Sequence, residues 1–297
     1  MRLITRRHWL AAVSPLLAAS AFAQDAQPKE RSNASTAPPD LYRAIAAFWE
    51  PHEREIVDSL NVQAGARVLD AGCGRGDHLL LFARNARVTG LDLKESSLEF
   101  ARDRLRASGR FERVTLQVGD IFKMPFPPQS FDLVWSSHVF HGLRNLSEAA
   151  AAIRRVIKPG GRFALRENRV TASLLPDDLG VGEPGLESRL NRAFETWLRK
   201  DRAERGRYQH GWTHLLHAAG FRDVCARCFL HQAAPPFTDL QKQYLHYWLA
   251  RKREIEGVLP SDIEVLNQLA DSASPHYFLK RDDLVFTSIS SVFIGVV

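Results

Sequence analysis

The sequence is poor in cysteine and has no long apolar run. Three cysteines in 297 residues are too few for a disulfide scaffold. No apolar run reaches the roughly 18 residues that a membrane-spanning helix needs. The sequence also has little net charge. Its value of +6 includes three arginines in the first 23 residues, which contain no acid. The rest has 37 basic and 34 acidic residues, which disfavours a nucleic-acid partner.

The remaining composition is that of an ordinary globular protein. Hydrophobic residues make up 45% of the chain and charged residues 25%, which excludes fibrous and wholly disordered classes. The length fits one α/β domain with an extra element, although two small domains would also fit.

Residues 1–23 have the features of a secretory signal peptide. Three arginines precede an apolar stretch over residues 9–17, and residues 21–23 read Ala-Phe-Ala, which fits the cleavage pattern. Residues 5–10, Thr-Arg-Arg-His-Trp-Leu, resemble a twin-arginine signal, which implies export of the folded chain by that machinery and a periplasmic or exported location. A general secretory signal, an uncleaved anchor and a mitochondrial presequence are alternatives. Without a working signal the chain would stay in the cytoplasm.

After the signal, residues 24–40 are rich in proline, serine, asparagine and alanine, so we expect a flexible linker there. A single domain is then expected over 41–297. Its first half alternates helical and strand patterns with short links, which predicts an α/β fold with a doubly wound, mostly parallel sheet covered by helices on both faces. The expected helices are 41–60 (interrupted at Pro51), 77–85, 95–107 and 147–157, and the expected strands are 67–70, 87–92, 114–118, 131–136 and 162–166.

The second half is less regular. Helices are expected at 187–205, 212–219, 239–257 and 262–271, and strands at 224–230 and 284–297. The helical region 237–280, an insertion before the last strand, contains five aromatic residues that either line an acceptor pocket or belong to the core. They are Tyr244, Tyr247, Trp248, Tyr277 and Phe278.

The most informative segment is a glycine loop after the first predicted strand. Gly72, Gly74 and Gly76 stand at alternate positions between that strand and a helix, where doubly wound sheets bind nucleotides. The dinucleotide fingerprint has a different spacing. Asp70, immediately before the loop, would repel a phosphate and suits a cationic ligand.

Two further acids end the next two predicted strands. Asp92 lies 22 residues after Asp70 and can accept hydrogen bonds from both hydroxyls of a ribose. Asp120 can accept from an adenine amino group, with Ile121 packing on the ring. Any one of these acids is often only a helix cap, but three in order on one sheet edge predict a ligand site.

These segments resemble the class I S-adenosylmethionine-dependent methyltransferases. There the D-x-G-x-G-x-G loop holds the methionine end of the cofactor, the acid after the second strand holds the ribose, and the Gly-Asp-Ile step binds adenine. Segments 131–138, 155–161 and 211–221 match its small-molecule, ubiquinone-biosynthesis-like branch. The resemblance is most specific over 66–166. It implies S-adenosylmethionine as cofactor and, as cofactor-binding residues, Asp70, Gly72, Gly74, Gly76, Asp92, Leu93, Asp120, Ile121 and Ser136.

The resemblance also implies a seven-stranded sheet whose last strand is antiparallel. It implies transfer of a methyl group by in-line displacement to O, N or C of a small, hydrophobic or aromatic acceptor. An exported enzyme has no evident supply of this cytoplasmic cofactor. The alternative is therefore an exported ligand-binding protein on a methyltransferase scaffold, without turnover.

Candidates for acid–base chemistry follow the fourth and fifth predicted strands. His141 is the first choice as a catalytic residue, and Glu167 and His138 are further candidates, although either histidine can be purely structural. Tyr208 and His210 are candidates for the acceptor side. No metal site is predicted. Cys225 and Cys228 lack a second ligand pair, and on one strand they would point to opposite faces.

Overall fold

The computed structural model describes residues 39–167, 172–205 and 211–297. The expected signal peptide and most of the expected linker lie outside the described residues, as do Tyr208 and His210. The first described helix, α3 (Pro39–Ser59), begins two residues before the expected start of the domain.

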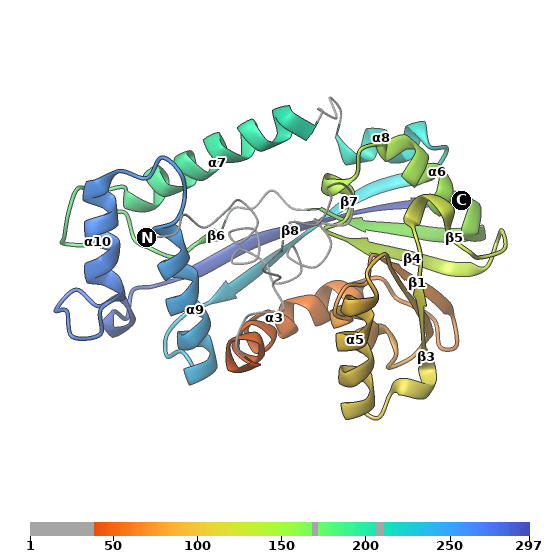
Figure 1. Ribbon diagram of the computed structural model, residues 1–297, viewed down its shortest axis with the longest axis horizontal. Coiled ribbons are helices and arrows are strands. Elements are labelled where there is room, and N and C mark those ends of the chain that lie inside the picture. The colour runs from red at the N-terminus through yellow and green to blue at the C-terminus, as the bar shows by residue number, and fades with distance from the viewer. Residues whose placement is uncertain (1–38, 168–171, 206–210) are drawn as a thin grey trace.

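One mixed sheet contains every strand of the described ranges (Figure 1). Its parallel part has the order β3 (Val114–Val118), β2 (Arg87–Asp92), β1 (Arg67–Ala71), β4 (Phe131–Ser137) and β5 (Ile157–Arg166). The long last strand, β8 (Phe286–Val296), is antiparallel to β5, to β6 (Ala172–Ser173) and to β7 (Arg222–Ala233). The expected architecture is confirmed. β6 is an additional, eighth strand. It was not predicted, because a strand of two residues has no alternation of apolar and polar side chains.

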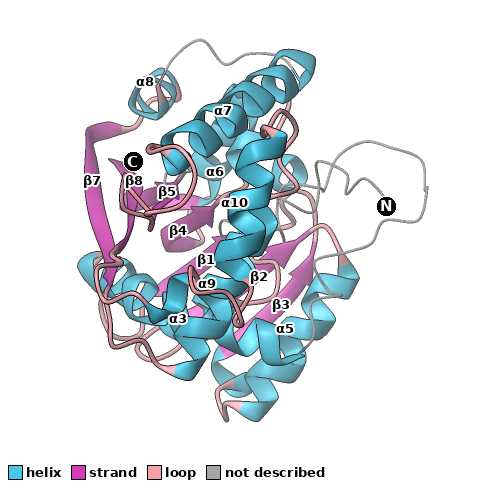
Figure 2. Ribbon diagram, turned by 90° about the vertical axis from the view of Figure 1, so that its left-hand side faces the viewer, coloured by secondary structure: helices cyan, strands magenta, loops and turns pink. Residues whose placement is uncertain are grey.

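Alternation along the central strands sorts side chains into two cores, one on each face of the sheet. Val68 belongs to the core with α4 (Asp77–Phe82) and α5 (Glu95–Ala107), whereas its neighbour Leu69 belongs to the core with α6 (Leu146–Val156) and α8 (Trp212–Ala218). Figures 1 and 2 show α3 and α5 on one side of the sheet and α6 and α8 on the other. Both faces are therefore covered, as the sequence predicts.

A third core surrounds the C-terminal end of β7 and the N-terminal end of β8. It is built by the first half of α3 together with α7 (Leu186–Arg205), α9 (Asp239–Lys252) and α10 (Pro260–Ala270). Tyr244, Trp248 and Phe278 are at most 1% exposed within it, so these three aromatic residues are core rather than pocket lining. Along the described ranges, no helix has the apolar length required to cross a bilayer.

The expected interruption of the first helix at Pro51 is wrong, because α3 runs through this residue. Proline removes one helical hydrogen bond and crowds the preceding turn. Buried residues on both sides of it, Phe48 and Trp49 before and Ile56 after, keep the two halves packed on the rest of the domain. Elsewhere the differences are at element ends: α9 stops at Lys252, and β7 extends beyond the predicted strand at both ends.

Candidate active site

The glycine loop joins β1 to α4 and lies between the ends of β2 and β4. A Cβ atom on Gly72, whose φ is +85°, would lie 2.4 Å from Cγ2 of Val139 in the loop after β4. The backbone N–H groups of Gly72 and Cys73 both donate to the carbonyl oxygen of Leu91, at 2.7 and 2.9 Å. Only glycine fits this conformation and this close approach, so the loop is fixed at the carboxyl edge of the sheet.

Asp92, at the end of β2, is bonded to this loop. Its Oδ2 accepts a hydrogen bond from the N–H of Gly74 at 2.9 Å, and its Oδ1 accepts one from the N–H of Lys94 at 2.9 Å. The residue is 5% exposed, and burial raises its pKa although the backbone donors oppose the shift. Each carboxylate oxygen retains capacity for a second donor, which is what a pair of ribose hydroxyls requires.

Asp70 lies at the end of β1, 1% exposed, and its Oδ2 has no hydrogen-bond partner in the described part of the chain. Burial raises its pKa to about 7, with the charge of His78 opposing and the charges of Asp92 and Asp77 adding. A buried carboxyl group with an unused oxygen suits a cationic group of a ligand. Together with Asp92 it disfavours a phosphate.

The other predicted cofactor residues lie along the same edge. Asp120 follows β3 and accepts the backbone N–H two residues on at 2.9 Å, and Ile121 beside it is buried. Leu93 follows Asp92 and is 38% exposed. Ser136 is buried and donates from Oγ to the carbonyl of Ala71 at 2.9 Å, so its hydroxyl supports the start of the glycine loop.

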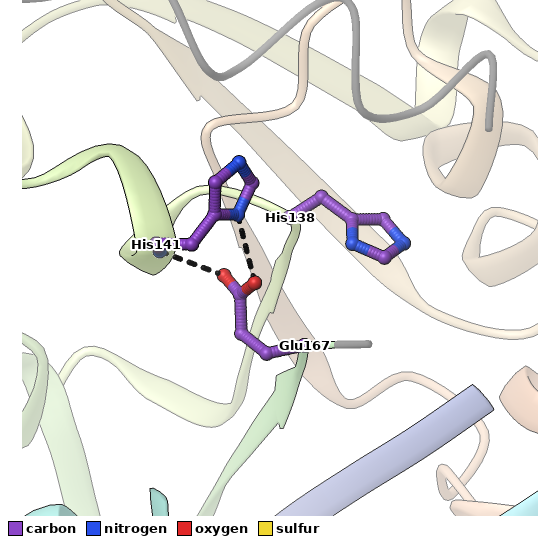
Figure 3. A group of neighbouring side chains, drawn as sticks. All are labelled: His138, His141 and Glu167. Atoms are coloured by element: carbon purple, nitrogen blue, oxygen red, sulfur yellow. Dashed lines mark hydrogen bonds and ion pairs between the residues drawn. The ribbon is translucent and has the colours of Figure 1, made fainter. Parts of the chain in front are cut away.

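His141 and Glu167, predicted separately, are brought together by the ends of β4 and β5 (Figure 3). Nδ1 of His141, in the turn η4 (Phe140–Gly142), lies 2.8 Å from Oε2 of Glu167, whose Oε1 accepts the His141 backbone N–H at 3.3 Å. The carboxylate favours the tautomer with the proton on Nδ1. Nε2 of His141 is buried and has no hydrogen-bond partner among the described residues.

His138 completes this group. Its backbone has a φ of +56°, unusual outside glycine, and its N–H donates to the carbonyl of Arg166 at 2.9 Å. One ring nitrogen of each histidine and one oxygen of Glu167 lie within 4.8 Å of one another. Burial lowers the pKa of His138 well below its usual value, and the charge of Arg166 adds to the shift, so the ring is neutral at pH 7.

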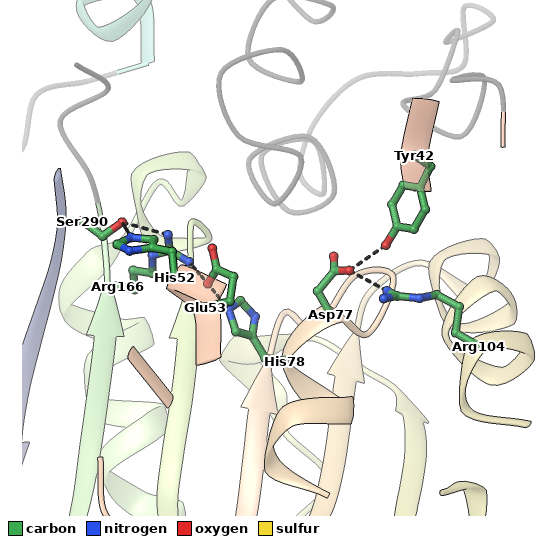
Figure 4. Close-up of polar contacts among 8 residues, drawn as sticks. All are labelled: Tyr42, His52, Glu53, Asp77, His78, Arg104, Arg166 and Ser290. Atoms are coloured by element: carbon green, nitrogen blue, oxygen red, sulfur yellow. Dashed lines mark hydrogen bonds and ion pairs between the residues drawn. The ribbon is translucent and has the colours of Figure 1, made fainter. Parts of the chain in front are cut away.

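A buried polar network around Arg166, the residue before Glu167, was not predicted from the sequence (Figure 4). Arg166 pairs with Glu53 from α3, and its other terminal nitrogen donates to Oγ of Ser290 at 2.8 Å. Nε2 of His78 lies 3.1 Å from the same Glu53 oxygen. Burial would raise the pKa of Glu53, but the Arg166 charge and the His78 hydrogen bond outweigh it and hold the pKa far below its usual value. The available signal was two polar residues, His52 and Glu53, among the apolar positions of α3.

A second contact fastens α3 over the glycine loop (Figure 4). The hydroxyl of Tyr42 donates to Oδ1 of Asp77 at 2.6 Å, and Arg104 donates to the same oxygen at 2.6 Å and to the carbonyl of Arg75 at 3.0 Å. The guanidinium of Arg75 lies 4.6 Å from the centre of the Tyr42 ring. The start of α3 therefore belongs to the cofactor side of the site.

Cys225 and Cys228 lie on β7 as expected, and both are exposed, free thiols.

Comparison with known proteins decides the family. The model of a family described as a methyltransferase domain matches residues 63–253. The chain belongs to this methyltransferase-domain family. It is 36% identical over 126 residues to a demethylmenaquinone methyltransferase of Symbiobacterium thermophilum, a match covering 41% of this chain and 50% of that protein. It is 41% identical over 144 residues to a ubiquinone/menaquinone biosynthesis C-methyltransferase of Bordetella avium, covering 46% and 52%.

A sterol 24-C-methyltransferase of Gibberella zeae is 35% identical over 182 residues, covering 60% of this chain and 44% of that one. The matches thus span about half the length of these relatives. Among solved structures, phosphoethanolamine N-methyltransferase 2 of Haemonchus contortus, in complex with phosphomonomethylethanolamine and S-adenosylhomocysteine, has a TM-score of 0.50 and 19% identity, covering 88% and 58%. That likeness shows the methyltransferase fold.

Proposed function

We propose that this chain is an S-adenosylmethionine-dependent methyltransferase that acts on a small molecule. The observation that carries the proposal is two buried acids at the glycine loop: Asp70 at the end of β1 with an unused oxygen, and Asp92 bonded to the N–H of Gly74. Membership of the methyltransferase-domain family supports it, as do relatives named for methyl transfer to quinone precursors and sterols.

The residues present fit this cofactor. Asp70 suits the cationic methionine end, the glycine loop lets a ligand approach the backbone, and Asp92 has capacity for two ribose hydroxyls. We propose Asp120 and Ile121, at the end of β3 on the same sheet edge, for the adenine ring. When bound, the cofactor supplies a methyl group on a sulfonium, which is already a good leaving group. The protein therefore has mainly to align donor and acceptor, which can lower a barrier by about 7–11 kcal/mol.

On the acceptor side, we propose His141 and Glu167 as the groups that bind and activate the acceptor. Glu167 fixes the orientation of the His141 ring and leaves Nε2 without a hydrogen-bond partner among the described residues. The acceptor is a small, hydrophobic or aromatic molecule that presents an O, N or C nucleophile. The test is methyl transfer from isotope-labelled S-adenosylmethionine to a panel of demethylated quinols, phenols and sterols, followed by mass spectrometry. More than one product per protein establishes an enzyme. Cofactor binding without turnover on any acceptor would favour an exported ligand-binding protein.

We also propose that residues 1–23 act as a twin-arginine export signal, which places the mature chain outside the cytoplasm. The Thr-Arg-Arg-His-Trp-Leu run at residues 5–10 and the Ala-Phe-Ala run at 21–23 support this. Replacing both Arg6 and Arg7 by lysine should retain the chain in the cytoplasm with its N-terminus intact. Intact mass of the chain from each cell fraction checks this, and an unprocessed wild-type chain confined to the cytoplasm would contradict it.

A further inference from the structure

His138, His141 and Glu167 form one group at the ends of β4 and β5. A nitrogen from each histidine and an oxygen from Glu167 lie within 4.8 Å of one another. His138 and Glu167 are at most 3% exposed, and the His141 side chain is 22% exposed. Backbone contacts fix the group, because the N–H of His138 donates to Arg166 and that of Glu167 donates to Ser291. These are three potential ligands on an anchored scaffold.

The donor set is that of a transition-metal site. Two imidazoles and one carboxylate are the protein ligands of many catalytic zinc sites and of non-haem iron sites. Two ligand atoms bound to one such ion at about 2.1 Å are about 3.0–3.4 Å apart. The 2.8 Å between Nδ1 of His141 and Oε2 of Glu167 is already close to this spacing. A ring nitrogen of His138 lies within 4.8 Å of the other two ligand atoms, and its ring points away from them, so binding would require the His138 side chain to move inward (Figure 3).

We propose that His138, His141 and Glu167 bind one divalent transition-metal ion, with zinc as the representative. Three protein ligands leave a coordination position open. The loop that carries His138 continues into Val139, which touches the glycine loop at Gly72. The group of His138, His141 and Glu167 is thus linked through one residue to the glycine loop. Given the proposed methyltransferase function, on which this part rests, the ion holds an acceptor through an oxygen atom.

The local charges agree with a cation at this point. Arg166, the residue before Glu167, is buried and positively charged, but its charge is paired with that of Glu53. Glu167 carries an additional negative charge, and the histidines bind metals as neutral rings. Metal binding would displace the proton that Nδ1 of His141 shares with Oε2 of Glu167 across their 2.8 Å contact.

The experiment measures zinc binding to the full chain. After treatment with a chelator, the protein is dialysed against zinc and its metal content is determined by mass spectrometry, and affinity is measured by chelator competition. Cobalt then replaces zinc, since its visible absorption reports nitrogen and oxygen ligation and a low coordination number. The test variants are His138→Gln and Glu167→Gln. The matched controls are His217→Gln, on the exposed face of α8, and the double variant Cys225→Ser/Cys228→Ser.

We expect about one zinc per wild-type chain and per control chain. Loss of a ligand should weaken affinity by more than about 100-fold, since loss of a mere supporting contact costs 10–100-fold. Less than about 0.2 zinc per wild-type chain would overturn the proposal. So would a zinc affinity of His138→Gln and Glu167→Gln equal to that of the wild-type chain. Circular dichroism of the metal-free variants excludes misfolding. Binding of S-adenosylmethionine, measured on the same samples, separates failure of this site from failure of the proposed function.

Discussion

The backbone N–H of Gly74 donates a 2.9 Å hydrogen bond to Oδ2 of Asp92. This bond ties the loop after β1 to the acid at the end of β2, so that the elements predicted to hold the methionine end and the ribose of the cofactor form one unit. Its strength depends on a loop conformation that only glycine adopts readily, and on a buried carboxyl group that accepts from backbone donors.

Gly72→Ala should destabilise the chain more than the same change at another glycine of similar conformation. At Gly72 the new Cβ would lie 2.4 Å from Cγ2 of Val139 at a φ of +85°, whereas Gly65 has a φ of +76° and nothing within 4 Å. Gly65→Ala therefore isolates the backbone cost, about 1 kcal/mol, and Gly72→Ala should exceed it by about 1–3 kcal/mol of overpacking. Urea unfolding measures both, and equal losses would contradict the close approach of the two loops.

Asp70→Asn should stabilise the chain without ligand at neutral and higher pH, while weakening cofactor binding. The folded pKa of Asp70 is raised to about 7, above an unfolded value of about 4. The folded state therefore binds more protons between these values, and stability falls as pH rises from about 4 to about 7. Asparagine removes that loss. Urea unfolding at pH 5 and pH 8 should show the advantage of the variant growing with pH. A constant difference would contradict the raised pKa.

The same carboxyl group should make cofactor affinity depend on pH. A cationic ligand group favours the ionised form of Asp70, so affinity should rise by up to about tenfold per pH unit below 7 and level off above it. Calorimetry in buffers of different ionisation enthalpy should detect release of a proton on binding near pH 6.5. Absence of proton release, with normal affinity, would mean that Asp70 is already charged.

Glu53→Gln should be strongly destabilising. It leaves Arg166, which is 1% exposed, with its positive charge buried and its main partner lost, and breaking such a pair typically costs about 3–5 kcal/mol. The matched control is Asp132→Asn, whose half-exposed ion pair with Lys158 has a 2.6 Å contact and should contribute less than about 1 kcal/mol. Thermal or urea unfolding of both variants makes the comparison. If Glu53→Gln and Asp132→Asn lowered the free energy of unfolding by similar amounts, the Glu53–Arg166 pair would not be a main support of α3.

Glu167→Gln should lower the rate of methyl transfer while leaving cofactor affinity unchanged. The amide cannot hold the His141 ring with a charged hydrogen bond, and loss of a positioned acid–base or ligand group typically costs about 10²–10⁴-fold in rate. The control is Glu148→Gln at the exposed start of α6. Single-turnover measurement with saturating cofactor separates the two effects, and an unchanged rate would remove Glu167 from the chemistry.

Much of the sheet and its carboxyl edge could be predicted because they depend on local pattern. Alternation and apolar runs identify the strands, and parallel strands bring Asp70, Asp92 and Asp120 to one edge wherever the helices lie. Glycine spacing likewise marks a turn whose conformation is fixed by the backbone alone. These residues therefore appeared together in the structure where the sequence placed them.

The contacts that could not be predicted all depend on how distant segments dock. Glu53 and Arg166 are separated by 113 positions and meet only because α3 packs across the sheet. His141 and Glu167 belong to neighbouring strand ends, but their 2.8 Å contact follows from the turn after β4 and the left-handed backbone of His138. Pro51 shows the converse, since packing on both sides outweighs a local preference to end the helix.

The most direct test of the account is calorimetric titration of the full chain with S-adenosylmethionine and with its demethylated product, using Asp92→Ala as the comparison. We expect micromolar binding by the wild-type chain. We expect the variant to lose about 2 kcal/mol or more, the scale of hydrogen bonds to a charged group, while its circular dichroism is unchanged. Absence of binding by a folded wild-type chain, or equal binding by the folded variant, would contradict the cofactor site at the glycine loop.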